Sequence, residues 1–248
     1  MDISYWTQLN PTVKVTYTKR LFHDFYAHRL KIYIPAGRLL RDTNLTHLGE
    51  EQHYADRIAF LIKRANEWAG KTYYYGINKD SSLKNADAKQ LNNTRLLMTE
   101  LEPSVRVRIE EPHAIFYSND IEKLKRFAQV STGRIVEITT TKNQEHHQIL
   151  LDGNEIKNPK NSYKYKLVLS RMWDPSDYAR ESQDAIKSIL ENAGTDVRTT
   201  DNVIKNLSRA YFSGGYIYTN DDRLAFLMNI ARPGFVKKIY SLVDLSDK

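Results

Sequence analysis

The stretch Gly-Tyr-Ile-Tyr-Thr-Asn-Asp at residues 215–221 decides how the chain is interpreted, because a version of it occurs twice. Residues 115–120 read Ile-Phe-Tyr-Ser-Asn-Asp, and residues 216–221 read Tyr-Ile-Tyr-Thr-Asn-Asp. Each copy predicts a strand followed at once by a helix start, because a short polar side chain accepts the free amides of a first helical turn. A closing strand is expected behind each copy, at 134–140 and at 236–243.

A second pair of matching segments lies upstream of these copies. Tyr-Lys-Tyr-Lys-Leu-Val-Leu-Ser at residues 163–170 aligns with Tyr-Ala-His-Arg-Leu-Lys-Ile-Tyr at residues 26–33. With the helices that apolar periodicity predicts between these strands, each half reads strand, helix, strand, strand, helix, strand. That order is typical of the ferredoxin-like arrangement, in which two helices cover one face of a four-stranded antiparallel sheet.

The chain is therefore predicted to be an α+β protein of two tandem ferredoxin-like (βαββαβ) repeats, with helices on one face of each antiparallel sheet. The expected divisions are an N-terminal extension at 1–25, a first repeat at 26–141, a linker or small hairpin at 142–161, and a second repeat at 162–248. The first repeat is the longer one, and we expect its additional residues mainly as an insertion at 70–100.

Composition restricts the chemistry. The 248 residues carry a net charge of +7 and include no cysteine, so disulfides, thiolate metal sites and cysteine nucleophiles are excluded. A basic surface favours a polyanionic partner, nucleic acid first, although the same charge could serve solubility alone. The chain also contains 16 tyrosines, whose rings can stack on bases when they lie on an open sheet face.

Strand alternation predicts which side chains occupy the face of each sheet that the helices leave open. Basic residues and tyrosines alternate there, which suits a single nucleic-acid strand, because cations bind phosphates while rings stack on bases. The alternative is that the two sheets pack on each other or on a protein partner. The residues expected to bind nucleic acid are Arg29, Lys31, Tyr33, Arg106, Arg108, Tyr117, Lys166, Tyr216 and Tyr218.

Two short motifs resemble those of RNA recognition motif domains. Ile32-Tyr33-Ile34 looks like their first-strand motif, and Gly215-Tyr216-Ile217-Tyr218 looks like the centre of their third-strand motif, with Tyr216 and Tyr218 in the stacking positions. The two motifs lie in different halves of the chain. The tandem arrangement also resembles the repeat-processing endoribonucleases of CRISPR systems, but the chain has only Gly214-Gly215 and Gly234 in place of their glycine-rich loop. The layout is further similar to that of uncharacterised bacteriophage proteins.

Few residues suggest catalysis. His23 and His28 could act as general acid and base in metal-free RNA cleavage, but surface histidines without a catalytic role are the simpler interpretation. His146 and His147 are adjacent and would point to opposite faces of a strand, so metal binding is not expected there. The sequence contains no phosphate-binding loop, nucleophile elbow or dinucleotide fingerprint. No cofactor and no metal are expected.

The first hypothesis is thus a non-enzymatic protein that binds RNA or single-stranded DNA. A structural or assembly protein, of viral origin for example, is the second, and a metal-free endoribonuclease is the third. The sequence contains no apolar run of the length that spans a bilayer and no signal-peptide pattern, so no membrane association is expected. The expected location is the cytoplasm, or the host cytoplasm if the protein is viral.

Overall fold

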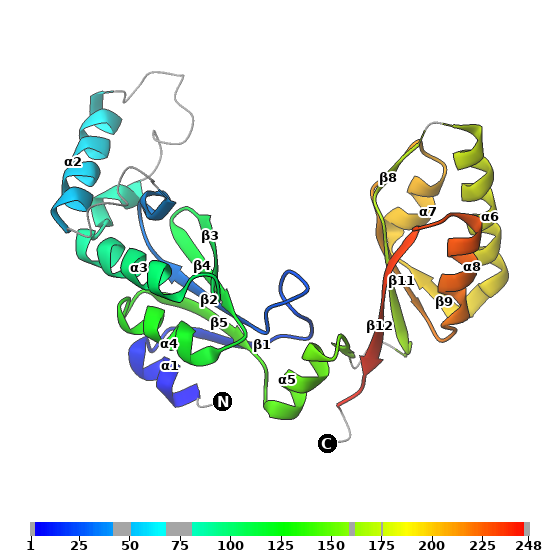
Figure 1. Cartoon of the computed structure of the whole chain (residues 1–248), viewed down its shortest axis with the longest axis horizontal. Coiled ribbons are helices and arrows are strands. Elements are labelled where there is room, and N and C mark those ends of the chain that lie inside the picture. The colour runs from blue at the N-terminus through cyan, green and yellow to red at the C-terminus, as the bar shows by residue number, and fades with distance from the viewer. Residues whose placement is uncertain (1–2, 42–50, 68–80, 159–161, 175, 246–248) are drawn as a thin grey trace. The chain divides into compact units, whose positions relative to one another are not determined.

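The chain divides into two compact units, Met1–His147 and Gln148–Lys248. The computed structural model describes residues 3–41, 51–67, 81–158, 162–174 and 176–245. The described residues of each unit form one five-stranded sheet with helices, which confirms the α+β class (Figure 1). Among these residues, no helix has the length and apolar character needed to cross a membrane.

The sheet of the first unit has the strand order β1-β5-β2-β4-β3. Its pairs are antiparallel except β1 with β5, which run parallel. The elements are α1 (Ile3–Leu9), β1 (Lys14–Tyr17), β2 (His28–Tyr33), η1 (Gly37–Arg41), α2 (Glu51–Glu67), η3 (Ser81–Asn85), α3 (Ala88–Leu101), β3 (Arg106–Glu110), β4 (His113–Ser118), α4 (Ile121–Gln129) and β5 (Ile135–Thr140).

The core of the first unit lies between the sheet and helices α3 and α4. In β2 the burial alternates along the strand, so Leu30 and Ile32 pack in the core while Lys31 lies on the opposite face. The Phe116 ring of β4 stacks on the Phe127 ring of α4, with centroids 4.2 Å apart. The helix α4 begins at Asp120, whose side chain accepts a hydrogen bond from the Glu122 amide, as the Asn-Asp pattern predicts.

The second unit has the strand order β6-β12-β7-β11-β9, again with one parallel pair, β6 with β12. Two further short strands, β8 and β10, form a separate antiparallel ribbon. The elements are β6 (Glu155–Ile156), β7 (Tyr165–Leu169), β8 (Met172–Trp173), α6 (Asp177–Ala193), η4 (Gly194–Asp196), β9 (Val197–Thr199), α7 (Asp201–Leu207), β10 (Tyr211–Phe212), β11 (Gly215–Thr219), α8 (Arg223–Ala231) and β12 (Val236–Val243).

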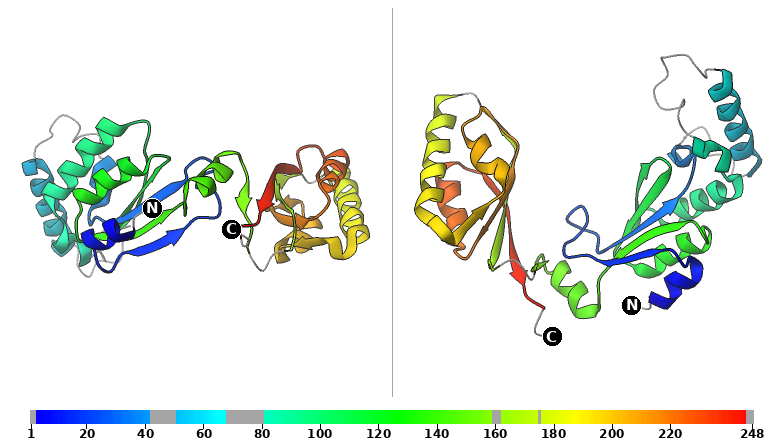
Figure 2. Two further views of the ribbon diagram at one scale, coloured as in Figure 1. Left: turned by 90° about the horizontal axis from the view of Figure 1, so that it is seen from below. Right: turned by 180° about the vertical axis from the view of Figure 1, so that it is seen from behind.

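Helices α6, α7 and α8 bury one face of this second sheet. Leu167 of β7 and Ile217 of β11 are fully buried among apolar residues of these helices, such as Ile186, Val203 and Met228. The views in Figure 2 show α6 and α8 together on one side of the sheet. Lys166 and Tyr218 alternate with the buried residues, so they lie on the other face.

The two sheets share one strand order. The sequence β5-β2-β4-β3 in the first unit corresponds, strand by strand along the chain, to β12-β7-β11-β9 in the second. Each sheet also has a fifth strand that pairs in parallel at the same edge, β1 beside β5 and β6 beside β12. Residues 1–25 are therefore not only an extension, and the sheets are mixed rather than purely antiparallel as expected.

In the stretch 142–161, of which the structure describes residues up to 158, the described residues do not form the small hairpin considered from the sequence. Gln144–Leu151 form helix α5, in which the Asn143 side chain accepts a hydrogen bond from the His146 amide at 2.8 Å. Glu155–Ile156 pair with β12 instead of folding back on α5. Of the predicted insertion at 70–100, residues 70–80 lie outside the described residues, and the remainder contains η3 and α3.

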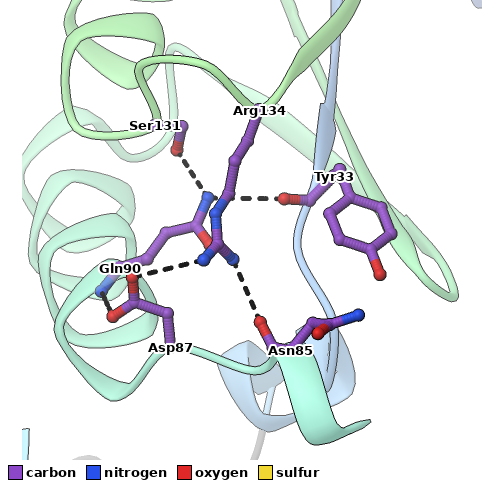
Figure 3. A network of polar contacts seen from close by, with 6 residues as sticks. All are labelled: Tyr33, Asn85, Asp87, Gln90, Ser131 and Arg134. Atoms are coloured by element: carbon purple, nitrogen blue, oxygen red, sulfur yellow. Dashed lines mark hydrogen bonds and ion pairs between the residues drawn. The ribbon is translucent and has the colours of Figure 1, made fainter. Parts of the chain in front are cut away.

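A polar network fixes the start of α3 against the sheet (Figure 3). The Arg134 guanidinium donates to the Gln90 side-chain oxygen at 2.9 Å and to the Asn85 carbonyl at 3.2 Å, and it lies 3.5 Å from the Asp87 carboxylate. Gln90 is buried, and its amide donates to the Ser131 hydroxyl at 3.0 Å. The longer connection of the first unit is thus held by hydrogen bonds to the turn just before β5, and these bonds satisfy the buried Gln90 amide.

Candidate nucleic-acid interface

A cleft of about 880 Å³ lies in the second unit, at the end of β7 and the start of β11, next to the β8–β10 ribbon. Residues from four chain segments line it. Those that bear on its chemistry are Ser170, Arg171, Ser213, Gly214, Tyr216 and Lys237. Of the predicted residues, only Tyr216 lines this cleft.

Two glycines shape the cleft. Gly214 has φ +80°, and a Cβ there would lie 3.0 Å from the Leu169 carbonyl oxygen. Gly215 has φ +153°, and a Cβ there would lie 2.5 Å from a methyl carbon of Val203 in α7. Any other residue at 215 would collide with the helix, so the turn from the ribbon into β11 requires glycine.

The charge in the cleft is positive. The side chains of Arg171 and Lys237 are exposed, and within the part of the chain that the structure describes neither has an acidic partner. Lys237 occupies a bulge of β12, where the register against β7 shifts between Val236 and Lys238. A bulge redirects a side chain that regular alternation would place elsewhere, which explains why alternation alone did not identify Lys237.

Hydroxyl groups complete the cleft lining. The Ser170 hydroxyl donates to the Gly234 carbonyl at 2.6 Å, which connects β7 to the turn before β12. The Ser213 hydroxyl accepts a hydrogen bond from the Asn206 side chain at 3.0 Å and keeps its own proton for a further acceptor. Two cations beside the Ser213 hydroxyl are donors of the kind that phosphate oxygens accept from in protein–nucleic acid contacts.

Lys166 does not have the role expected from the sequence. Its ammonium lies 2.8 Å from one carboxylate oxygen of Glu155 and 2.9 Å from the other, and both residues are buried. The same ammonium lies 4.5 Å from the centroid of the Tyr216 ring and 5.4 Å from that of Tyr240. Strand β6 brings Glu155 to the open face, so Lys166 supports the rings and is not exposed to a phosphate.

Tyr216 and Tyr218 both lie half-buried on this face, as predicted. Tyr216 borders the cleft, with Lys166 against its ring. Tyr218 is opposite Arg198 of β9 in the strand register, and its ring centroid lies 6.4 Å from that of Tyr163. A partly exposed ring that is held by its neighbours is the kind of platform on which a base stacks.

In the first unit, the predicted basic residues share the face opposite the helices. Arg106 and Arg108 of β3 are exposed, and Lys31 of β2 is half-buried. Arg29 lies 2.9 Å from Glu137, and Arg108 lies 2.6 Å from Glu110, so carboxylates offset these two cations. Among described residues, Arg106 and Lys31 have no acidic partner, and they remain the cations of this face that are open to a phosphate.

Tyr117 lies on the same face but is only 4% exposed. The segment before β2 folds over it, with ring centroids at 4.7 Å for His23, 5.8 Å for Phe22 and 6.1 Å for Tyr26. Burial raises the pKa of the Tyr117 hydroxyl. The prediction that Tyr117 stacks on a base is therefore wrong for this arrangement, because its ring is already covered.

Tyr33 stands at the end of β2, where the backbone is fixed from two sides. Its amide donates to the Arg134 carbonyl at 2.8 Å, and its carbonyl accepts from the Gln90 side chain at 3.4 Å (Figure 3). Its ring contacts His113 edge to face, with centroids 5.8 Å apart. The ring remains half-buried, so Tyr33 is a partly accessible tyrosine on the open face of the first unit.

The two histidines considered for acid–base chemistry have different surroundings, since His23 is exposed and His28 is buried. His28 is 6% exposed, shares a hydrogen bond of 2.7 Å with the Thr140 hydroxyl and stacks on His147 at 5.2 Å. Burial, followed by the neighbouring His147, lowers the pKa of His28 to about 4. His146 and His147 belong to helix α5 and not to a strand, and the described residues include no group of three His, Asp or Glu able to hold a metal ion.

The cleft residues Arg171 and Lys237 were not among the predicted site residues. The signal available in the sequence was the Gly214-Gly215 pair next to the predicted strand, together with Gly234 two residues before the last strand. The structure brings these glycines together through Ser170, which lies beside Gly214 and bonds to Gly234. Comparison of the chain with protein-family models, curated proteins and solved structures finds no match.

Proposed function

We propose that this protein binds RNA or single-stranded DNA without cleaving it, and that the cleft beside Tyr216 is its main contact. The observation that carries the proposal is the pairing, in one 880 Å³ cleft, of two exposed cations with a half-buried tyrosine. Cations bind the phosphates of a strand irrespective of its sequence, while an aromatic ring stacks on any base.

We further propose that the two units are ferredoxin-like repeats. In both sheets the first strand of the repeat is central, flanked by the third and the fourth, and the second strand lies outside the third. This arrangement supports an origin by duplication, with β1 and β6 as equivalent added strands. In such a fold the sheet face away from the helices is the surface left for a ligand.

The first unit has a proposed contact of its own, with Arg106 and Lys31 as its cations. Each lies on the open face of its sheet and lacks an acidic partner among the described residues. Tyr33 offers a half-buried ring on the same face. Each unit thus presents cations and a tyrosine to a polyanion on the open face of its own sheet.

A protein-assembly function is supported by a different feature. On helix α8 the side chains of Phe226, Leu227 and Ile230 are exposed. These residues lie on the helix side of the sheet, so a protein partner there would not compete with nucleic acid on the open face. An assembly protein would bind its partner through apolar area, and that binding would vary little with salt.

The test is fluorescence-anisotropy titration of labelled single-stranded RNA and DNA at two salt concentrations. The double variant Arg171→Gln/Lys237→Gln should weaken binding and reduce the salt slope by about 0.7 for each phosphate that the protein no longer neutralises. The matched control, Arg180→Gln/Lys187→Gln, removes the same charge from helix α6 and should leave both the affinity and the slope unchanged. Absence of binding by the wild type at low salt would contradict the proposal.

A further inference from the structure

The β8–β10 ribbon presents two large aromatic side chains to solvent. Trp173 is 70% exposed and Tyr211 is 50% exposed, and the two residues are direct partners in the antiparallel register. Their neighbours Met172 and Phe212 pack instead into the core of the second unit. Trp173 and Tyr211 therefore point away from that core, as Tyr216 does in the sheet.

The ribbon is held in place although it is only two residues long on each side. The Asp174 amide donates to the Ala210 carbonyl at 3.1 Å, and the buried Gln183 side chain donates to the Arg209 carbonyl at 3.0 Å. The Phe212 ring packs 5.1 Å from the Phe235 ring in the core. The ribbon that carries Trp173 and Tyr211 is therefore held in place by buried groups such as Gln183 and Phe212, and not by contacts of the two exposed rings.

The pair adjoins the cleft. Trp173 follows the cleft residue Arg171 by two positions, and Tyr211 precedes the cleft residue Ser213 by two. Two residues of extended chain cover about 7 Å, so the Cα atoms of Trp173 and Tyr211 lie within roughly that distance of the Cα atoms of Arg171 and Ser213.

The surroundings of the pair are basic. Arg171 and Arg209 are both exposed, and neither has an acidic partner within the described ranges of the chain. The nearest acidic residue in sequence, Asp174, lies 3.6 Å from the Arg232 guanidinium, which offsets its charge. Exposed rings next to unpaired cations complement a polyanion that carries aromatic bases. An apolar protein surface would not need these cations.

We propose that Trp173 and Tyr211 stack on unpaired bases of the strand whose phosphates Arg171 and Lys237 hold. This inference rests on the proposed function and narrows the ligand to a single strand with accessible bases. A duplex presents its phosphates to the cleft but keeps its bases stacked and paired. The Trp173 and Tyr211 rings would therefore not increase its affinity. The bases stack on this ribbon in addition to Tyr216.

The experiment compares three labelled probes of equal length with the full chain: a single strand with all its bases, the same strand with abasic sites, and a duplex. Trp173→Leu and Tyr211→Leu should each weaken binding of the base-bearing strand by about 5- to 150-fold and leave the abasic strand and the duplex unchanged. Phe226→Leu, which also truncates an exposed ring but on α8, should have no effect. The base-bearing strand should also quench tryptophan fluorescence, and Trp173→Leu should remove the quenching.

The outcomes separate the two proposals. If the base-bearing and abasic strands bind equally, and Arg171→Gln/Lys237→Gln weakens both, the cleft binds phosphate and the stacking inference is overturned. If none of the probes binds at low salt, the proposed function itself fails. Retention of the ribbon variants' circular dichroism spectrum would show that weaker binding does not come from misfolding.

Discussion

Lys166 and Glu155 form a buried ion pair that joins the edge strand β6 to the centre of the second sheet. The ammonium contacts both carboxylate oxygens, at 2.8 and 2.9 Å, and lies against the Tyr216 and Tyr240 rings. Lys166, whose ammonium lies against the Tyr216 ring at the cleft, is thereby neutralised by the Glu155 carboxylate of strand β6. The pair replaces the phosphate contact expected for Lys166.

Substitution of Lys166 should therefore affect stability before binding. Lys166→Met leaves Glu155 as an uncompensated buried charge, which costs about 3–5 kcal/mol of unfolding free energy. The double variant Lys166→Met/Glu155→Leu removes both charges and should recover most of that loss. Urea denaturation followed by circular dichroism measures the three free energies. A single variant as stable as the wild type would show that the pair is not buried as described.

Gly215→Ala should destabilise the second unit more than other glycine substitutions. Its new methyl group would lie 2.5 Å from Val203 at a φ of +153°, so overpacking and backbone strain add, at roughly 2–4 kcal/mol together. Gly153→Ala is the matched control, because Gly153 also has a positive φ but nothing lies within 4 Å of its Cβ position. Equal losses in thermal denaturation would contradict the close approach of α7 to β11.

The stability of the first unit should fall in mild acid because of His28. The folded-state pKa is about 4 and the ordinary value is 6.5, so the unfolded chain binds a proton more readily than the folded chain between these values. The contribution of neutral His28 is complete above pH 6.5 and is lost as the pH falls toward 4, by roughly 3 kcal/mol.

Hydrogen exchange of the β2 and β5 amides in the full chain, at pH 7.5 and at pH 4.5, measures this loss. In His28→Gln the difference between the two pH values should shrink, after correction for intrinsic exchange rates. His113→Gln is the comparison: burial also lowers the pKa of His113, but its side chain is only half-buried, so its substitution should change the pH difference less. An unchanged pH difference in His28→Gln would show that other groups cause it.

Tyr216 and Tyr117 should differ in their effect on binding, although the sequence predicted both on the open face of a sheet. Tyr216→Leu should weaken binding of single-stranded RNA or DNA by about 1–3 kcal/mol, because it removes a ring that borders the cleft. Tyr117→Leu should alter stability and leave affinity unchanged, since its ring is covered by Phe22, His23 and Tyr26. Anisotropy titration of the two variants under one salt condition gives the comparison. A larger loss of affinity in Tyr117→Leu than in Tyr216→Leu would show that Tyr117, and not Tyr216, contacts the nucleic acid.

The main strands, and the sheet face on which their side chains lie, could be predicted because both depend on local alternation of apolar and polar residues. Leu30 and Ile32 alternate with Arg29, Lys31 and Tyr33, and the structure buries both of them in the core as expected. The helix start at Asp120 follows from side-chain chemistry within three residues. The repeated order of elements also came from the sequence, since both copies keep the same pattern.

Whether a residue on the open face of a sheet is exposed to solvent depended on segments outside its own strand. Tyr117 is covered by residues 22–26, and Lys166 is neutralised by Glu155 of a strand that pairs only at the sheet edge. Lys237 reaches the cleft through a bulge, and Trp173 is exposed because Met172 and Phe212 fill the core beside it. The sequence by itself determined the order of the main strands and helices of each repeat and the face on which regularly alternating strand residues lie, because both follow from short-range periodicity. Only the tertiary structure decided which of those side chains are exposed to solvent. Covering segments, ion-pair partners and strand bulges change the exposure of a side chain, and they depend on packing between residues distant in the chain.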